Sequence, residues 1–126
     1  MLARRVAPAE AYRQVEFEAR VYGASRQELV AICFEQLIGS LGTAIYAKRM
    51  GDPYLSSRSM SRAVSSLLAL EMGISGSDGL AAAMRDLYQG ARNSIIGCSV
   101  NYDEKILQTI RKDFVEIWQA MSAQTN

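Results

Sequence analysis

The chain has 126 residues, enough for one domain with a single shared core and too few for two separate cores. Hydrophobic residues make up 49% of the sequence and charged residues 21%, a balance typical of a globular protein and not of a disordered one. The formal net charge is +1. A value so close to zero argues against nucleic acid or an anionic membrane surface as a partner, because both require clustered Lys and Arg.

Histidine is absent from the sequence. Its absence excludes Ser-His-Asp and Cys-His nucleophile systems, most zinc sites, and di-iron bundles built on Glu-x-x-His motifs. The sequence also contains no glycine-rich phosphate loop, no GxSxG element and no pair of carboxylates spaced for acid–base work. We therefore predict a protein that is not an enzyme and that binds no cofactor or metal.

The two cysteines, Cys33 and Cys98, lie within apolar helical patterns and form no CxxC motif. This usage indicates reduced, buried thiols and favours a cytoplasmic protein. No apolar segment typical of a signal peptide follows Arg4 and Arg5. The longest uncharged run, residues 36–47, is too short to span a bilayer, so we expect no membrane insertion.

Apolar residues recur at intervals of three or four along nearly the whole chain, which predicts helices throughout. A short first helix over residues 11–22 ends at Gly23, a residue tolerated in the left-handed conformation that ends helices. The second helix begins cleanly at Ser25, which has the spacing of a capping box with Glu28. We expect this helix to run to about Met50.

The third predicted helix follows a turn. Gly51 closes the second helix, and Asp52-Pro53 has the pattern of an N-cap and a first helical residue. The apolar stripe of the third helix ends at Met72. The glycine-rich residues 73–79 then break the helical pattern.

Two more helices complete the chain. A nearly continuous apolar stripe predicts the fourth helix over residues 80–98, and Asn101 with Glu104 predicts the cap of a last helix that reaches residue 121. Four long helices with short loops can bury their stripes only against each other. The prediction is an all-α protein, an antiparallel four-helix up-and-down bundle with a short extra N-terminal helix.

The second predicted helix carries apolar residues over an arc of roughly 180°, wider than the ~100° of a one-sided surface helix. Two interpretations are open: the helix is central to the bundle, or part of the arc lines a groove for a partner. Mid-helix glycines each cost about 1 kcal/mol relative to alanine, so we expect a neighbouring helix or a bound partner to approach them closely. These glycines are Gly39, Gly42, Gly90 and Gly97.

A series of short motifs extends over residues 9–122. The motifs are Ala11-Tyr12, Gln14-Val15, Ala24-Ser25-Arg26-Gln27-Glu28-Leu29, Ile32-Cys33-Phe34-Glu35, Gly51-Asp52, Ser61-Arg62-Ala63, Leu87-Tyr88 and Ile117-Trp118. In this order and spacing they resemble the FliS family of flagellin export chaperones. The chain departs from the family pattern at Arg26, where the family usually has proline, and at residues 88–91, where the family's Tyr-Asp-Tyr-Met is Tyr-Gln-Gly-Ala.

The resemblance implies a cytoplasmic helical chaperone. Such a protein holds the otherwise disordered C-terminal segment of flagellin, prevents premature filament assembly and delivers its client to the type III export gate. We expect one domain over residues 1–126, with a bundle core at 25–122. In the family the N-terminal segment, here residues 1–23, can lie over the client groove until the client arrives.

We expect five residues to bind the client. Val30, Phe34 and Ile38 follow one another at four-residue intervals and would line an apolar groove. Tyr12 matches a tyrosine of the family, so the resemblance makes it a candidate switch at that groove. Val15 is the fifth residue expected to bind the client. A tyrosine that packs the short helix onto the bundle is the equally open alternative for Tyr12.

Other functions remain open at this point. A self-associating structural bundle would close the same grooves on a second copy and form a homodimer. A diverged member of the family would bind another flagellar protein in place of flagellin.

Overall fold

The structure, a computed structural model, describes residues 8–124, and for residues 8–10 and Tyr12 it describes the backbone alone. Over the described range the chain forms five helices and no strand, which confirms the prediction of an all-α protein. The helices are α1 (Pro8–Tyr22), α2 (Arg26–Arg49), α3 (Pro53–Met72), α4 (Gly79–Val100) and α5 (Glu104–Gln124).

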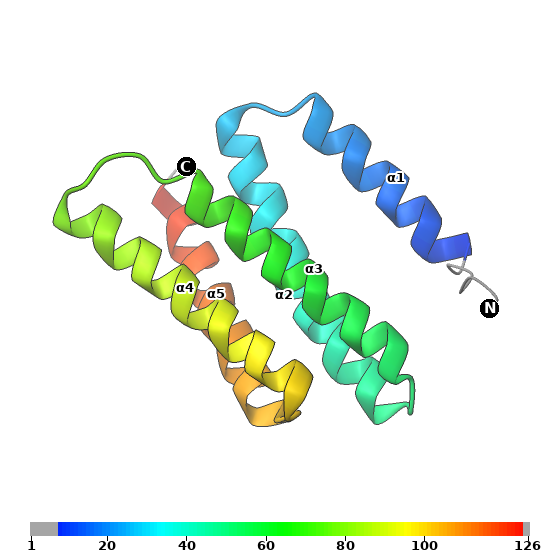
Figure 1. Cartoon of the computed structure of the whole chain (residues 1–126). Helices are drawn as coiled ribbons and strands as arrows, with labels where there is room; N and C mark the ends of the chain where they lie inside the picture. The colour runs from blue at the N-terminus through cyan, green and yellow to red at the C-terminus, as the bar shows by residue number, and fades with distance from the viewer. Residues whose placement is uncertain (1–7, 125–126) are drawn as a thin grey trace. The chain divides into compact units, whose positions relative to one another are not determined.

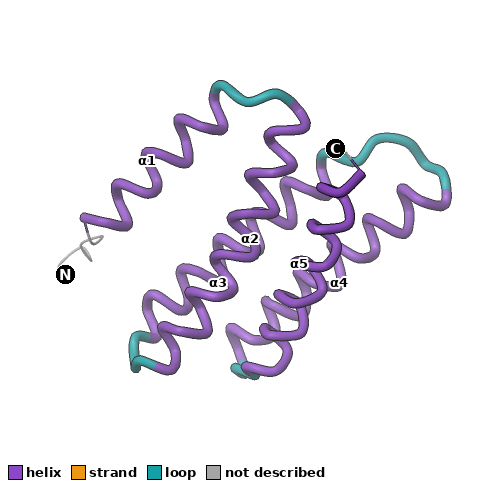
Figure 2. The backbone as a smooth tube through the Cα atoms, turned by 180° about the vertical axis from the view of Figure 1, so that it is seen from behind, coloured by secondary structure: helices purple, strands orange, loops and turns teal. Residues whose placement is uncertain are grey.

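The chain divides into two compact units, the first ending at Ile32 and the second beginning at Cys33. The first unit contains α1 and the start of α2, and the second contains the rest of α2 with α3, α4 and α5. The predicted boundary at residues 23–25 coincides with the turn between α1 and α2, whereas the units divide within α2. In the second unit α3 lies beside α4, and α4 lies beside α5 (Figures 1 and 2).

Side-chain caps start two of the helices as predicted. In the capping box, the Ser25 amide donates to Glu28 Oε1 at 3.3 Å and the Glu28 amide donates to Ser25 Oγ at 3.2 Å. Asp52 caps α3, where its Oδ1 accepts a hydrogen bond from the Leu55 amide at 3.0 Å. Gly51 has a φ of 78°, a left-handed conformation that favours glycine, so α2 ends where the sequence predicts.

Two helix boundaries are built differently from the prediction. Asn101 ends α4, where its amide donates to the Gly97 carbonyl at 2.9 Å, so it does not cap the last helix. Asp103 stands directly before α5, and its Oδ1 accepts from the Lys105 amide at 3.0 Å, because a cap must adjoin the first turn to reach its free amides. The first helix ends before Gly23 as predicted, but Gly23 is not among the glycines with a positive φ.

Large apolar side chains from α2, α3, α4 and α5 form the core of the second unit. The Phe34 ring centroid lies 5.1 Å from that of Trp118 and 6.1 Å from that of Phe114. The Tyr88 ring lies 6.1 Å from Phe114. Other large apolar side chains with no exposed surface are Leu37, Leu41, Leu67, Ile95 and Leu107.

Small side chains lie between α2 and α3. Ser56 Oγ donates to the Ala44 carbonyl at 2.8 Å, and Gln36 Nε2 donates to Ser66 Oγ at 2.9 Å. The separation of two packed helices depends on the side chains between them, so small residues permit a close approach. The hydrogen bonds of this α2–α3 seam thus join Ala44 to Ser56 and Gln36 to Ser66. Other small buried residues on the same two helices are Ser40 and Ala47 on α2, and Ser59 and Ala63 on α3.

Among the described residues, α2 is the one helix long and apolar enough to cross a membrane. The apolar core helix of a soluble protein passes the same test of length and composition. In α2, 39% of the apolar window is buried, and Phe34, Leu37 and Leu41 have no exposed surface. The place of α2 in the core therefore accounts for part of its apolar composition.

Candidate partner-binding surfaces

The five residues predicted to bind a partner are divided between the two units. Val15 on α1 is 65% exposed and Val30 on α2 is half-buried, and both belong to the first unit. Phe34 and Ile38 belong to the second unit and are one helical turn apart. The side chain of Tyr12 lies outside the described residues, so its switching role stays a prediction.

Phe34 is enclosed by the core. It has no exposed surface, and its ring stacks on Trp118 with an interplanar angle of 19°. A partner could touch this side chain only if α2 and α5 separated. The visible role of Phe34 is therefore to hold α5 against α2, as the interpretation of α2 as a central helix implies.

Ile38 is half-buried and takes part in a contact that the sequence did not predict. Its backbone carbonyl accepts a hydrogen bond from Arg111 Nε of α5 at 3.1 Å. The guanidinium passes over Gly42, where an added Cβ would lie 3.2 Å from Nε and 3.8 Å from Nη2. The absence of a side chain at Gly42 thus leaves room for the expected close neighbour, which is Arg111 of the same chain.

The other three mid-helix glycines have no such neighbour. A Cβ added at Gly39, Gly90 or Gly97 would meet nothing within 4 Å. A neighbouring helix of the same chain, as far as the structure describes it, does not account for them. The alternative of a bound partner is left open at these positions.

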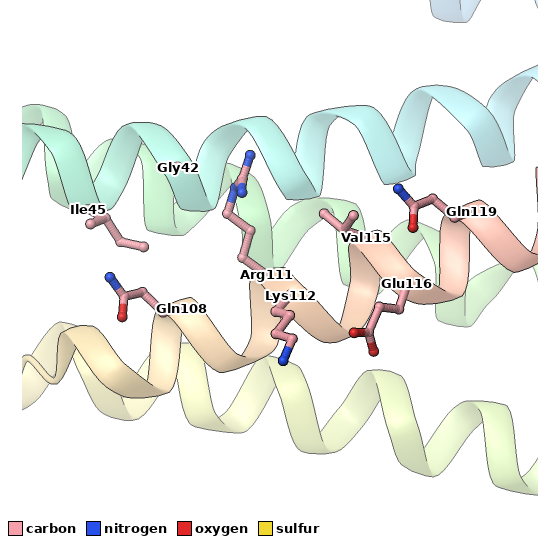
Figure 3. Close-up of a pocket in the computed structure, with 8 residues that line it drawn as sticks. All are labelled: Gly42, Ile45, Gln108, Arg111, Lys112, Val115, Glu116 and Gln119. Atoms are coloured by element: carbon pink, nitrogen blue, oxygen red, sulfur yellow. The ribbon is translucent and has the colours of Figure 1, made fainter.

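A groove of about 570 Å³ follows the boundary between α2 and α5 (Figure 3). Ile45 of α2 and Val115 of α5 contribute apolar side chains to this α2–α5 groove. Arg111, Lys112 and Glu116, all from α5, contribute charge. The groove is thus lined by apolar and charged groups together, with two cations and one carboxylate.

Sequence reasoning missed the α5 side of this groove. Residues on that flank of α5 are mostly polar and were indistinguishable from a solvated helix face. The one available signal is Val115, an apolar residue outside the predicted stripe that contains Ile110, Phe114 and Ile117. It shows that α5 has a second apolar position beside its core-facing stripe.

Large apolar side chains are also exposed on α3 and α4. Met72 near the end of α3 is 85% exposed, and Val100 at the end of α4 is 88% exposed. Further exposed apolar residues are Leu68 on α3 and Leu80, Leu87 and Ile96 on α4. A partner with apolar side chains therefore has accessible contacts on several helices of the second unit.

Ion pairs join helices of the second unit at Arg49 and Glu104 and at Arg92 and Glu71. Arg49 Nε donates to Glu104 Oε1 at 2.8 Å, and Nη2 donates to Oε2 at 2.7 Å. These hydrogen bonds, and the charge of Arg49, lower the pKa of Glu104 below its usual value. Arg92 Nη2 lies 3.2 Å from Glu71 Oε2. The first pair joins α2 to α5 and the second joins α3 to α4, so both are structural.

The two cysteine thiols are poorly placed to react as nucleophiles. Both cysteines are free, Cys98 is buried and Cys33 is half-buried. Burial raises the pKa of the Cys33 thiol, which favours the protonated form, and a protonated thiol is a poor nucleophile. Within residues 8–124 no group of three or more His, Cys, Asp or Glu could hold a metal ion.

Comparison with known families gives one match. The family described as flagellar protein FliS matches residues 8–125, a span that includes all five helices. No curated protein matches the chain, and no solved structure matches it.

Proposed function

Since the chain belongs to the FliS family of flagellar proteins, whose role is that of an export chaperone, we propose that it binds the C-terminal segment of flagellin in the cytoplasm. Binding would prevent premature polymerisation and deliver flagellin to the flagellar type III export apparatus, through contact with the export gate. The family match over nearly the whole chain is the observation that carries this proposal.

Exposed apolar side chains support a client of this kind. Val15 and Tyr22 on α1 are 65% and 95% exposed, and further apolar residues are accessible on α3 and α4. A disordered segment that folds on binding loses conformational entropy, and it offsets that loss by burying apolar surface against its chaperone. Such binding is largely hydrophobic, so raising the salt concentration should change the affinity little.

We assign client contact to Tyr12, Val15, Val30 and Ile38. Phe34 contributes by holding α2 against α5, because its ring is enclosed by Trp118 and Phe114. As the family resemblance implies, residues 1–23 would act as a cover over the client site, with Tyr12 as the switch. Residues 25–122 would act as an antiparallel four-helix bundle that presents the site.

Size-exclusion chromatography with light scattering tests the proposal. The chain is mixed with full-length flagellin, with flagellin lacking its C-terminal segment, and with flagellin lacking its N-terminal segment as the matched control. We expect a one-to-one complex with the full-length and N-terminally truncated proteins. We expect no complex when the C-terminal segment is missing, since that segment is the proposed client.

The other outcomes each contradict the proposal. A tight homodimer that added flagellin does not change would favour the self-associating bundle. Binding to a different flagellar protein, with none to any flagellin form, would identify a diverged member of the family. The proposed role includes no catalysed reaction, because a chaperone of this family acts by binding and releasing its client.

A further inference from the structure

The guanidinium of Arg111 is held in place beside an open groove. Its Nε donates to the carbonyl of Ile38, which lies 73 residues away in the sequence. The rest of the group lies against Gly42, the position in α2 where the missing side chain leaves room for it. No carboxylate among the described residues pairs with Arg111, so its terminal nitrogens are available to a partner.

The surroundings of Arg111 combine charge with apolar surface. Lys112 adds a second cation to the α2–α5 groove, while Ile45 and Val115 add apolar side chains. Glu116 is the one carboxylate in the lining. The excess of cations favours an occupant with negative charge, and the apolar groups favour an occupant with an apolar side chain close to that charge.

We propose that the α2–α5 groove binds a client segment in which a carboxylate pairs with Arg111 and an adjacent apolar side chain contacts Ile45 and Val115. This inference rests on the proposed function, because the flagellin C-terminal segment is the occupant to which it assigns these contacts. Arg111 suits the role because guanidinium binds carboxylate with two parallel hydrogen bonds. Its anchored Nε also means that less side-chain freedom is lost when the client binds.

The length of the groove sets the size of the occupant. The lining residues of α5 run from Gln108 to Gln119, which is about 16 Å at 1.5 Å per residue. About three turns of a client helix fit this distance. One acidic residue and one or two apolar residues on a single face of such a helix would be enough to contact Arg111, Ile45 and Val115.

The test compares two pairs of variants in the full chain, using the purified C-terminal segment of flagellin as the probe. Arg111→Gln removes the anchoring charge, and Lys105→Gln removes a charge from α5 outside the groove. Gly42→Ala adds a Cβ that would lie 3.2 Å from Arg111 Nε, so the guanidinium must shift slightly, and Gly39→Ala adds one that meets nothing within 4 Å. The two alanine variants gain the same helix propensity, so any difference between them reports on Arg111.

We expect Arg111→Gln to weaken binding by about tenfold or more, as for the loss of a hydrogen bond to a charged group. Gly42→Ala should weaken it in the same direction, while Lys105→Gln and Gly39→Ala bind as the unchanged chain does. Replacing the acidic residues of the segment one at a time by their amides should identify one substitution that removes the effect of Arg111→Gln.

Three results would overturn the inference. Equal affinities for all four variants would show that the groove takes no part, while leaving the proposed function intact. A change in the mass of the free protein on Arg111→Gln would show that a second copy occupies the groove. Absence of binding by the unchanged chain would contradict the proposed function and this inference together.

Discussion

On one flank α2 packs against α3 through small residues, and on the other it packs against α5 through aromatic rings. The α2–α3 seam is closed by a hydrogen bond from Ser56 Oγ to the Ala44 carbonyl. The α5 flank has Phe34 stacked on Trp118, with the α2–α5 groove running along the same boundary. One helix can therefore form a tight seam on one flank and border an open groove on the other, because the side chains on the two flanks differ in size.

The largest expected effect is on the aromatic flank. Phe34→Ala should lower the free energy of unfolding by about 3–5 kcal/mol, because it leaves a cavity between Trp118 and Phe114. That is a large fraction of the 5–15 kcal/mol typical of whole domains. Urea unfolding followed by far-UV circular dichroism measures it, with Val15→Ala as the exposed control. A change below about 1 kcal/mol would show that Phe34 is not a core residue.

A larger side chain in the α2–α3 seam should destabilise the fold. Ala44→Leu should lower the free energy of unfolding by about 1–3 kcal/mol, because Ala44 has no exposed surface and its carbonyl is hydrogen-bonded to Ser56 of α3. Gln119→Leu adds an apolar side chain to the open groove, where we expect a change within about 0.5 kcal/mol. Similar values from the two variants in the same urea titration would mean that the flanks do not differ in packing.

Replacing two buried serines of α3 by alanine should change the free energy of unfolding with opposite signs. Ser56 Oγ is hydrogen-bonded, whereas the buried Ser59 Oγ has no hydrogen-bond partner in the part of the chain that the structure describes. Ser56→Ala should therefore destabilise the fold by about 1 kcal/mol, and Ser59→Ala should stabilise it by up to about 1 kcal/mol. Differential scanning calorimetry of the two variants measures both changes in stability. A destabilising Ser59→Ala would reveal a partner for that hydroxyl.

The smallest effect concerns the ion pair at the end of the α5 flank. Arg49 lowers the pKa of Glu104, so the pair stabilises the fold above the unfolded-state pKa and loses this effect as pH falls through the lower, folded-state pKa. Stability measured from pH 7 down past the usual carboxyl value of 4.5 should therefore fall further for the unchanged chain than for Glu104→Gln. Parallel curves of stability against pH for the two proteins would show that the ion pair does not contribute to stability. Between about pH 6 and 8 both curves should be flat, since the chain has no histidine.

Local patterns in the sequence were sufficient to predict the helices and several of their ends. The capping box at Ser25 and the cap at Asp52 depend on residues three apart, so the sequence displays them directly. The cap at Asp103 was missed because Asn101 and Glu104 have the same spacing as a capping box. Hydrogen-bond geometry, and not residue type, separates the two cases.

The candidate partner-binding surfaces were harder to predict because they depend on residues that are far apart in the sequence. The arc of α2 indicates where apolar residues lie, but whether Phe34 is buried depends on Trp118 and Phe114 of another helix. The contact from Arg111 to Ile38 joins residues 73 apart, and neither side chain signals it. In the sequence, only the mid-helix glycine Gly42 indicated a close neighbour at this point. That this neighbour is Arg111 became clear only from the packing of α5 against α2.

Isothermal titration calorimetry of the chain with the purified C-terminal segment of flagellin measures whether the chain binds this client through apolar surface. We expect one segment bound per chain, a negative heat-capacity change between about 10 and 30 °C from apolar burial, and little change in affinity between low and moderate salt. No binding of the segment, or an affinity that falls steeply with salt, would contradict this expectation.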